Sequence, residues 1–107
     1  MRNIALHAVF SSLFLLAGAR FASAGEAASV VIADLEFKPS VVTVRIGDTV
    51  TWINRDFVEH TATSRDGVFD VATPKSKPAH WRAQKAGEFS YYCRLHPNMT
   101  GTIRVTR

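Results

Sequence analysis

The sequence predicts an all-β fold, either a sandwich or a barrel. Short runs rich in β-branched and aromatic residues alternate with turn residues at close spacing, which is typical of such folds. No run with the 3.6-residue period of a helix competes with this pattern after residue 25. The 107 residues hold a single domain, and a hydrophobic content of 47% favours a folded chain over a disordered one.

Proline and glycine divide the first half of the domain into three strands. Pro39 interrupts strand pairing, so the segment around it is a connection. Gly47 can adopt the positive φ of a tight turn. In the last of the three strands, alternation sends Val50 and Trp52 to one face, which we expect to be the core. The predicted strands are residues 30–33, 41–45 and 49–54, joined by 34–40 and by the turn 46–48.

Prolines also mark the longest connection of the second half. Pro74 and Pro78, together with Lys75 and Lys77, indicate that residues 68–78 form a solvated loop. The predicted strands of this half are 60–63, 80–84, 88–93 and 102–105, and the connections include 55–59, the Asp66-Gly67 turn and the turn 85–87.

Alternation in the last two predicted strands indicates which side chains point inward. Phe89, Tyr91 and Cys93 share one face, so Cys93 faces the core, and Ile103 shares a face with Val105. Strand or core positions without assigned chemistry are Trp52, His80 and Trp81.

The N-terminal segment has the features of a secretory signal. Arg2 supplies a positive charge, residues 4–17 are apolar, and Ala22-Ser23-Ala24 is a small-residue cleavage site. The alternative is an uncleaved membrane anchor, but a spanning helix needs ~20 consecutive apolar residues. We therefore expect a signal peptide at 1–24, cleavage before Gly25, and an exported domain at 25–107.

The charge of the domain argues against nucleic acid as a partner. Without residues 1–24 the chain keeps 11 basic and 9 acidic residues, a formal charge of +2. The basic residues are scattered and are not interleaved with aromatic residues, as a stacking surface for bases requires.

Cys93 is the only cysteine in the chain, so no disulfide can form within it. Small exported domains often depend on disulfides. A lone thiol in an oxidising compartment is exposed to oxidation unless something occupies it. This is the first indication that Cys93 is a ligand.

The segment that begins at Cys93 has the spacing of a metal site. Cys93, His96 and Met99 follow one another at intervals of three residues, which lets a tight loop direct all three side chains to one point. Thiolate, imidazole and thioether together suit copper. His60 is the natural fourth ligand, because loops at one end of a sandwich meet in space.

These residues give the chain a resemblance to a known family. The run Val50-Thr51-Trp52-Ile53-Asn54-Arg55, followed by His60, Tyr91, Cys93, His96, Pro97 and Met99, resembles the cupredoxins, the blue type 1 copper proteins. The resemblance extends from Phe37 to the C-terminal end and is closest to members with the short Cys-x2-His-x2-Met spacing. It implies a Greek-key β-sandwich that holds one copper ion and carries single electrons in the periplasm, with no catalytic turnover.

The resemblance also implies a role for each site residue. Asn54 would hydrogen-bond near the thiolate and tie the two ligand loops together. Pro97 would contribute by having no N–H to donate toward the sulfur. The strong ligands would be His60, Cys93 and His96, with Met99 as the weak axial ligand.

The implied partners are other redox proteins of the periplasm. A c-type cytochrome and an amine dehydrogenase are the partners that the resemblance suggests, for a monomer without a membrane span. His96 would be the electron port, because a ligand in a short exposed loop can place its ring edge at the surface. Glu59 and Asn98 replace a proline and a phenylalanine that the family tends to have, so the surrounding surface is more polar.

Several other readings of these residues stay open. Zinc also binds cysteine and histidine, although a thioether argues against it. Cys93 and His96 could form a nucleophile and its base, although no oxyanion motif accompanies them. The chain could also deliver copper without an electron-transfer circuit, or be a structural β-domain without a metal.

Overall fold

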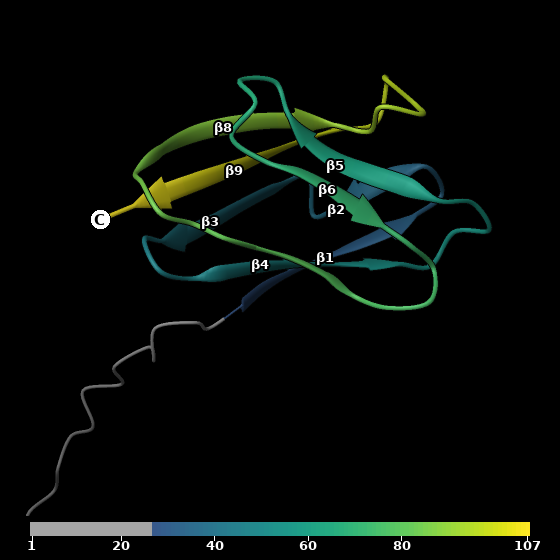
Figure 1. The fold of residues 1–107 in the computed structure, drawn as a ribbon, viewed down its shortest axis with the longest axis horizontal. Coiled ribbons are helices and arrows are strands. Elements are labelled where there is room, and N and C mark those ends of the chain that lie inside the picture. The colour runs from purple at the N-terminus through teal and green to yellow at the C-terminus, as the bar shows by residue number, and fades with distance from the viewer. Residues whose placement is uncertain (1–26) are drawn as a thin grey trace, which may run out of the picture.

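Within residues 27–107, nine β-strands form two sheets that face each other across one core (Figure 1). A computed structural model describes residues 27–107; the predicted signal peptide at 1–24 and its cleavage site lie outside this range. The strands are β1 (Ala27–Ala33), β2 (Glu36–Lys38), β3 (Val41–Arg45), β4 (Thr49–Asn54), β5 (His60–Ser64), β6 (Asp70–Thr73), β7 (Ala79–Arg82), β8 (Gly87–Tyr92) and β9 (Thr100–Thr106).

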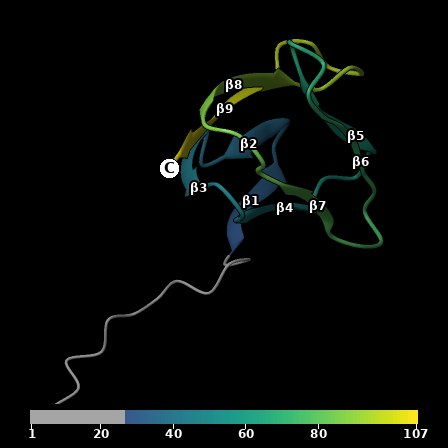
Figure 2. The ribbon, with the colours of Figure 1, turned by 60° about the vertical axis from the view of Figure 1, so that its left-hand side comes forward.

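The order of strands in each sheet confirms the predicted all-β sandwich. One sheet has the order β2-β1-β4-β7 and the other has β3-β9-β8-β5-β6 (Figure 2). β1 pairs with β4, and β3 with β9, in parallel, so segments far apart in sequence lie side by side. Among the residues that the structure describes, no helix is long and apolar enough to cross a membrane.

Aromatic side chains fill the space between the sheets. The rings of Trp52 and Tyr91 meet edge to face, with centroids 5.7 Å apart. The indole N–H of Trp52 donates to the Tyr91 hydroxyl at 3.3 Å. Burial raises the pKa of Tyr91 to about 12, although this hydrogen bond acts in the opposite direction. The residues predicted to face inward are all buried: Val50, Trp52, Phe89, Tyr91, Cys93, Ile103 and Val105.

Two short strands lie where the sequence indicates only connections. β6 falls within residues 68–78, which the prolines had marked as a loop, and pairs with β5. β2 falls within residues 34–40 and forms a hairpin with β1. Both are edge strands of three or four residues, too short and too exposed to show a clear alternation.

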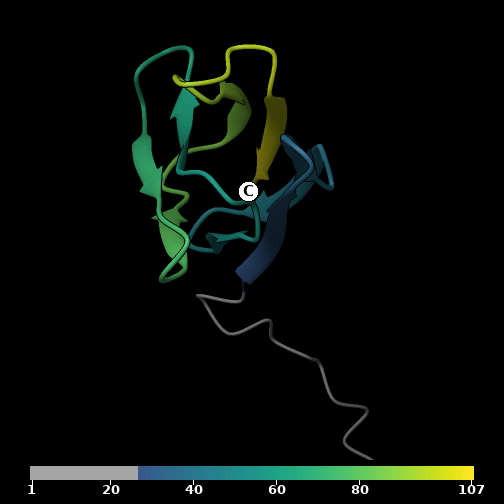
Figure 3. The same cartoon turned by 90° about the vertical axis from the view of Figure 1, so that its right-hand side faces the viewer.

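Three connections gather at one end of the sandwich, on the right in Figure 1. They are the β1–β2 turn, the β4–β5 loop and the β8–β9 loop, and Figure 3 views the molecule from this end. The β1–β2 turn has two residues with positive φ, Asp34 at 53° and Leu35 at 58°, as in a two-residue hairpin of type I′. The predicted site residues lie on or beside these connections.

Candidate metal centre

Three side chains from two separate segments converge at this end of the molecule. Cys93 Sγ lies 3.6 Å from Nδ1 of His60 and 3.8 Å from Nδ1 of His96. One donor atom from each of the three residues lies within 4.8 Å of the other two. His60 begins β5, whereas Cys93 and His96 belong to the β8–β9 loop. The prediction that these two segments meet is therefore confirmed.

The separations are those of atoms that share one ion. Nitrogen and sulfur ligands lie about 2.0–2.3 Å from a metal such as zinc, which puts neighbouring donors roughly 3.5–4 Å apart. Cys93 and His60 are fully buried, so their donor atoms are shielded from bulk solvent. The three residues fit a single metal ion, and thiolate with imidazole favours a soft or borderline one.

The β8–β9 loop holds its own shape through backbone hydrogen bonds. The N–H of Cys93 donates to the carbonyl of Met99 at 3.1 Å, which joins the two ends of the loop. The N–H of His96 donates to the Cys93 carbonyl, and that of Met99 to the His96 carbonyl, at 3.3 and 2.9 Å. This arrangement turns the chain twice within seven residues and keeps the backbones of Cys93 and Met99 adjacent.

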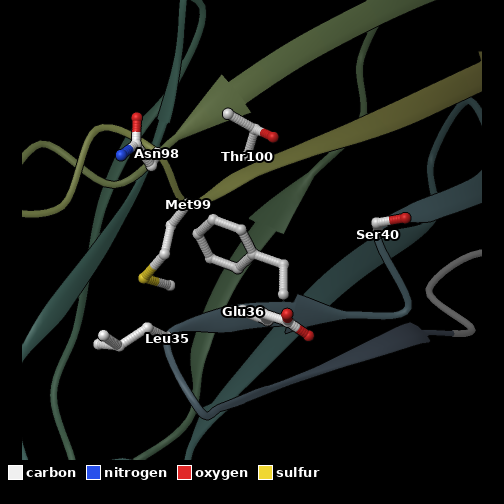
Figure 4. A pocket seen from close by; sticks show the side chains of 7 residues that line it. Leu35, Glu36, Ser40, Asn98, Met99 and Thr100 are labelled. Carbon is white, nitrogen blue, oxygen red and sulfur yellow. The ribbon is translucent and has the colours of Figure 1, made fainter.

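Met99 is buried below the loop. Its thioether lies in the wall of a pocket of about 360 Å³ that Leu35, Glu36 and Asn98 also line (Figure 4). The side chain thus occupies the gap between the β8–β9 loop and the β1–β2 turn.

Asp56 fixes the orientation of the His60 ring. Nε2 of His60 lies 2.8 Å from Oδ2 of Asp56. An ionised carboxylate can only accept a hydrogen bond, so Nε2 of His60 carries the proton. Nδ1 then keeps its lone pair free, and this lone pair faces Cys93. Burial by itself would raise the pKa of Asp56, but hydrogen bonds from the Leu35 N–H, from His60 and from the Asp34 N–H outweigh it and lower the pKa.

The sulfur of Cys93 accepts one backbone N–H. That N–H belongs to Thr61 and lies 3.4 Å from Sγ. Pro97 has no N–H, so the residue after His96 offers no second donor to the sulfur.

Asn54 does not have the contact expected of it. Its amide Nδ2 donates to the carbonyls of Val58 and Thr73 at 2.9 and 2.8 Å, and its Oδ1 accepts the N–H of Asp56. Asn54 therefore shapes the loop that carries Asp56 and leads to His60. Among the described residues, the two ligand segments are tied instead by the Arg94 N–H, which donates to Thr61 Oγ1 at 2.9 Å, and by the Thr61 N–H, which donates to the sulfur of Cys93.

Sequence reasoning missed Asp56 and Thr61. The only signal for Asp56 was an acidic residue four positions before a candidate ligand, and the signal for Thr61 was a hydroxyl directly after one. Neither position is informative until the loops are placed in space.

The surface around His96 is partly apolar. His96 is half-buried, and Leu95 beside it is 59% exposed. A groove of about 470 Å³ runs between the β1–β2 turn and the β8–β9 loop, with Leu35, Leu95 and Pro97 in its walls. Phe57, on the β4–β5 loop at the same end, is 94% exposed.

Comparison with known proteins gives matches over most of the chain. Residues 5–105 match the family model described as a cupredoxin-like domain. Amicyanin from Paracoccus denitrificans is 35% identical over 83 residues, which cover 71% of this chain and 63% of that protein. Amicyanin from Paracoccus versutus is 26% identical over 87 residues, covering 75% and 65%. The chain thus spans a little under two thirds of the length of these relatives.

Solved structures are also similar. An oxidised variant of amicyanin superposes with a TM-score of 0.65 at 31% identity, covering 73% of this chain and 80% of that one. A reduced Cu(I) form of another amicyanin variant, at pH 4, superposes with a TM-score of 0.64 at 31% identity, covering 75% and 82%.

Proposed function

This chain belongs to the cupredoxin-like family, and on that premise we propose that it binds one copper ion and carries single electrons between redox partners. The observation that carries the proposal is the buried group of Cys93 Sγ and the Nδ1 atoms of His60 and His96 at ligand separations. When bound, copper would supply a Cu(II)/Cu(I) couple that gains or loses one electron. The chain itself is then a carrier and not an enzyme.

The proposed ligands are His60, Cys93 and His96 as strong donors and Met99 as a weak, long axial donor. This donor set is the one found in blue copper sites. The buried position of Met99 beneath the β8–β9 loop, together with the backbone bond between Cys93 and Met99, supports its assignment.

The protein's contribution to electron transfer is a donor set that does not move. Asp56 holds the ring of His60, the Thr61 N–H holds the sulfur, and the backbone bonds of the β8–β9 loop hold Cys93 and His96. If the donor atoms keep the same positions before and after electron transfer, the site rearranges little. A small rearrangement favours fast electron transfer. The closed core also keeps water away from the sulfur.

His96 is the proposed point where electrons enter and leave. It is the only half-buried member of the three-residue group, and the exposed residues Leu95 and Pro97 flank it in the chain. Small, partly apolar surfaces suit the brief encounters of redox proteins. We assign the partners to the periplasm, where a c-type cytochrome and an amine dehydrogenase would exchange electrons with residues 25–107 after removal of 1–24.

Copper titration tests this function. One equivalent of Cu(II) added to the protein is expected to give an intense blue absorption and a narrow hyperfine splitting in the paramagnetic resonance spectrum. The colour should vanish on reduction and return on reoxidation, with copper retained throughout. A pale protein with a broad splitting would contradict the proposal, and release of Cu(I) on reduction would favour copper delivery instead.

Replacing the proposed thiolate ligand supplies the control. Cys93→Ser should lose the blue absorption and keep the β-sheet circular dichroism, because the hydroxyl fits the same space but is a poor copper donor. Cys93→Ala serves the same purpose if the buried hydroxyl of serine destabilises the fold. A blue colour in either variant would exclude Cys93 as the ligand.

A further inference from the structure

Four residues form a closed ring of hydrogen bonds beside the proposed copper site, through their side chains and one backbone N–H. Thr61 and Thr63 of β5 are buried, and their hydroxyl oxygens lie 2.9 Å apart. The Thr63 hydroxyl donates to Oδ1 of Asp70, on β6, at 2.8 Å. The same Oδ1 accepts from Nε of Arg94 at 3.2 Å, and the Arg94 N–H returns to Thr61 Oγ1 at 2.9 Å.

The chemistry of the four groups sets the direction of every bond in the ring. A hydroxyl has one hydrogen, and that of Thr63 goes to Asp70, whose carboxylate cannot donate. Thr61 must therefore donate to Thr63, which leaves the lone pairs of Thr61 Oγ1 free to accept the Arg94 N–H. Both branches of the ring end on the charge of Asp70, and bonds aligned in this way strengthen one another.

The contacts of Asp70, on which the ring ends, favour its charged form. The hydrogen bond from Thr63 lowers the pKa of Asp70, against a smaller effect of desolvation, and Arg94 lowers it further. The ion pair between Asp70 and Arg94 is about half exposed, so it adds little stability by itself. The importance of the ring lies in what it positions.

Thr61 connects the ring to the metal centre. Its side chain holds the backbone of Arg94, the residue after Cys93, and its own N–H donates to Cys93 Sγ. A shift of Thr61 would lengthen the N–H···S contact and separate the two ligand segments. A hydrogen bond to the sulfur stabilises the electron-rich thiolate, and outer contacts of this kind tune a metal.

We propose that Asp70 and Thr63 are positioning residues of the metal centre, which act through Thr61 to keep its N–H on the sulfur of Cys93. Neither residue hydrogen-bonds to a donor atom of the site in the described part of the chain. The inference rests on the proposed function for its effect on copper, but the ring itself can be tested without metal.

The first test uses hydrogen exchange in the metal-free protein. In Thr63→Val and Asp70→Ala, the amides of Thr61 and Arg94 should exchange about fivefold faster, the factor expected for one typical hydrogen bond. Thr63→Ser keeps the hydroxyl and should restore the slow exchange. Unchanged exchange in both Thr63→Val and Asp70→Ala would overturn the proposal.

The second test measures the reduction potential of the copper-loaded protein. Thr63→Val and Asp70→Ala should lower the potential, because the reduced state depends more on the N–H···S hydrogen bond. The matched control is Glu88→Ala, which removes another exposed carboxylate partnered with an arginine, Arg104 at 3.5 Å, on the same sheet. Equal potentials in the Asp70 variant and in this control would overturn the positioning role, since loss of charge alone would then explain the shift.

The two tests separate failure of this inference from failure of the proposed function. If the unmodified protein takes up no copper, the proposed function fails, and the exchange rates of the metal-free protein still decide whether the ring holds Thr61. If exchange accelerates while the potential stays constant, the ring is structural and the positioning role is wrong.

Discussion

The carboxylate of Asp56 accepts hydrogen bonds from two separate segments. The N–H groups of Asp34 and Leu35 donate to it at 2.7 and 3.1 Å, and Nε2 of His60 lies 2.8 Å away. The two N–H groups belong to a turn whose positive φ costs energy at a residue such as Leu35. Asp56 thus offsets that cost and orients a proposed ligand with one group.

Replacing Asp56 should weaken metal binding. In Asp56→Ala, Nε2 of His60 loses its acceptor, so the ring can turn or take the other tautomer. We expect copper affinity to fall about 10- to 100-fold, as for other contacts that orient histidine ligands. A competition titration against a chromogenic chelator measures this.

Asp48→Ala is the matched control for this prediction. Asp48 also accepts a turn N–H, that of Arg45 at 2.8 Å. Arg45 ends β3, and its turn lies at the opposite end of the sandwich from the site. The control should lose stability and keep its copper affinity; equal losses of affinity in both variants would contradict the role of Asp56.

At the residue scale, the sequence predicts contacts within one segment but not contacts between separate segments. The spacing of Cys93, His96 and Met99 is local, so their common loop could be predicted from sequence. The contacts of Asp56 and Thr61 depend on how separate segments pack, and no local pattern records that. The partners of Asn54, Val58 and Thr73, could not be predicted for the same reason, since they lie on a loop and on an edge strand.

At the scale of elements, the pairing of β8 with β9 depends on one glycine. Tyr91 lies directly opposite Gly101, and a Cβ placed on Gly101 would lie 2.5 Å from Cζ of the tyrosine ring. The ring is fully buried and cannot move aside without disturbing the core. The glycine is therefore required for close packing rather than for a positive φ.

Gly101→Ala should destabilise the protein by about 1–3 kcal/mol, the usual cost of overpacking a core. Thermal unfolding of the metal-free protein measures the loss. The comparison is Gly67→Ala, where φ is +80° but no atom lies within 4 Å, so only backbone strain of about 1 kcal/mol applies. A smaller loss at Gly101 than at Gly67 would contradict this account.

The strands that sequence predicted well are those with one buried face. β3 and β4 have the predicted bounds, because their buried and partly exposed residues alternate. β2 and β6 were missed because they are short edge strands, stabilised by pairing with β1 and β5 rather than by a pattern of their own. Because an edge strand is largely exposed, burial places few constraints on which residues it contains.

At the scale of the whole molecule, carboxylates bonded in the folded state set the response to acid. The Val68 N–H lowers the pKa of Asp66, against desolvation, and the Thr63 hydroxyl does the same for Asp70. Both pKa values lie below the ordinary value of 3.8, so the unfolded state binds more protons in this range. Their stabilising effect is present above pH 3.8 and is lost as the pH falls through the folded values.

Thermal unfolding of the metal-free protein between about pH 5 and pH 2 tests this linkage. The unmodified protein should lose stability more steeply on acidification than the double variant Asp66→Asn/Asp70→Asn. The difference between them should be largest above pH 3.8 and shrink below it. A difference independent of pH would exclude these two carboxylates as the cause.

The place of β9 in its sheet has a consequence for the order of assembly. β9 lies between β3 and β8, so the five-stranded sheet is divided until residues 100–106 take their place. Its parallel partner, β3, is about sixty residues away in sequence, and contacts of such long range close slowly. An N-terminal stretch emerging from a ribosome or a translocation pore therefore cannot complete this sheet. The β8–β9 loop, which carries Cys93 and His96, is anchored at both ends only once β9 has paired.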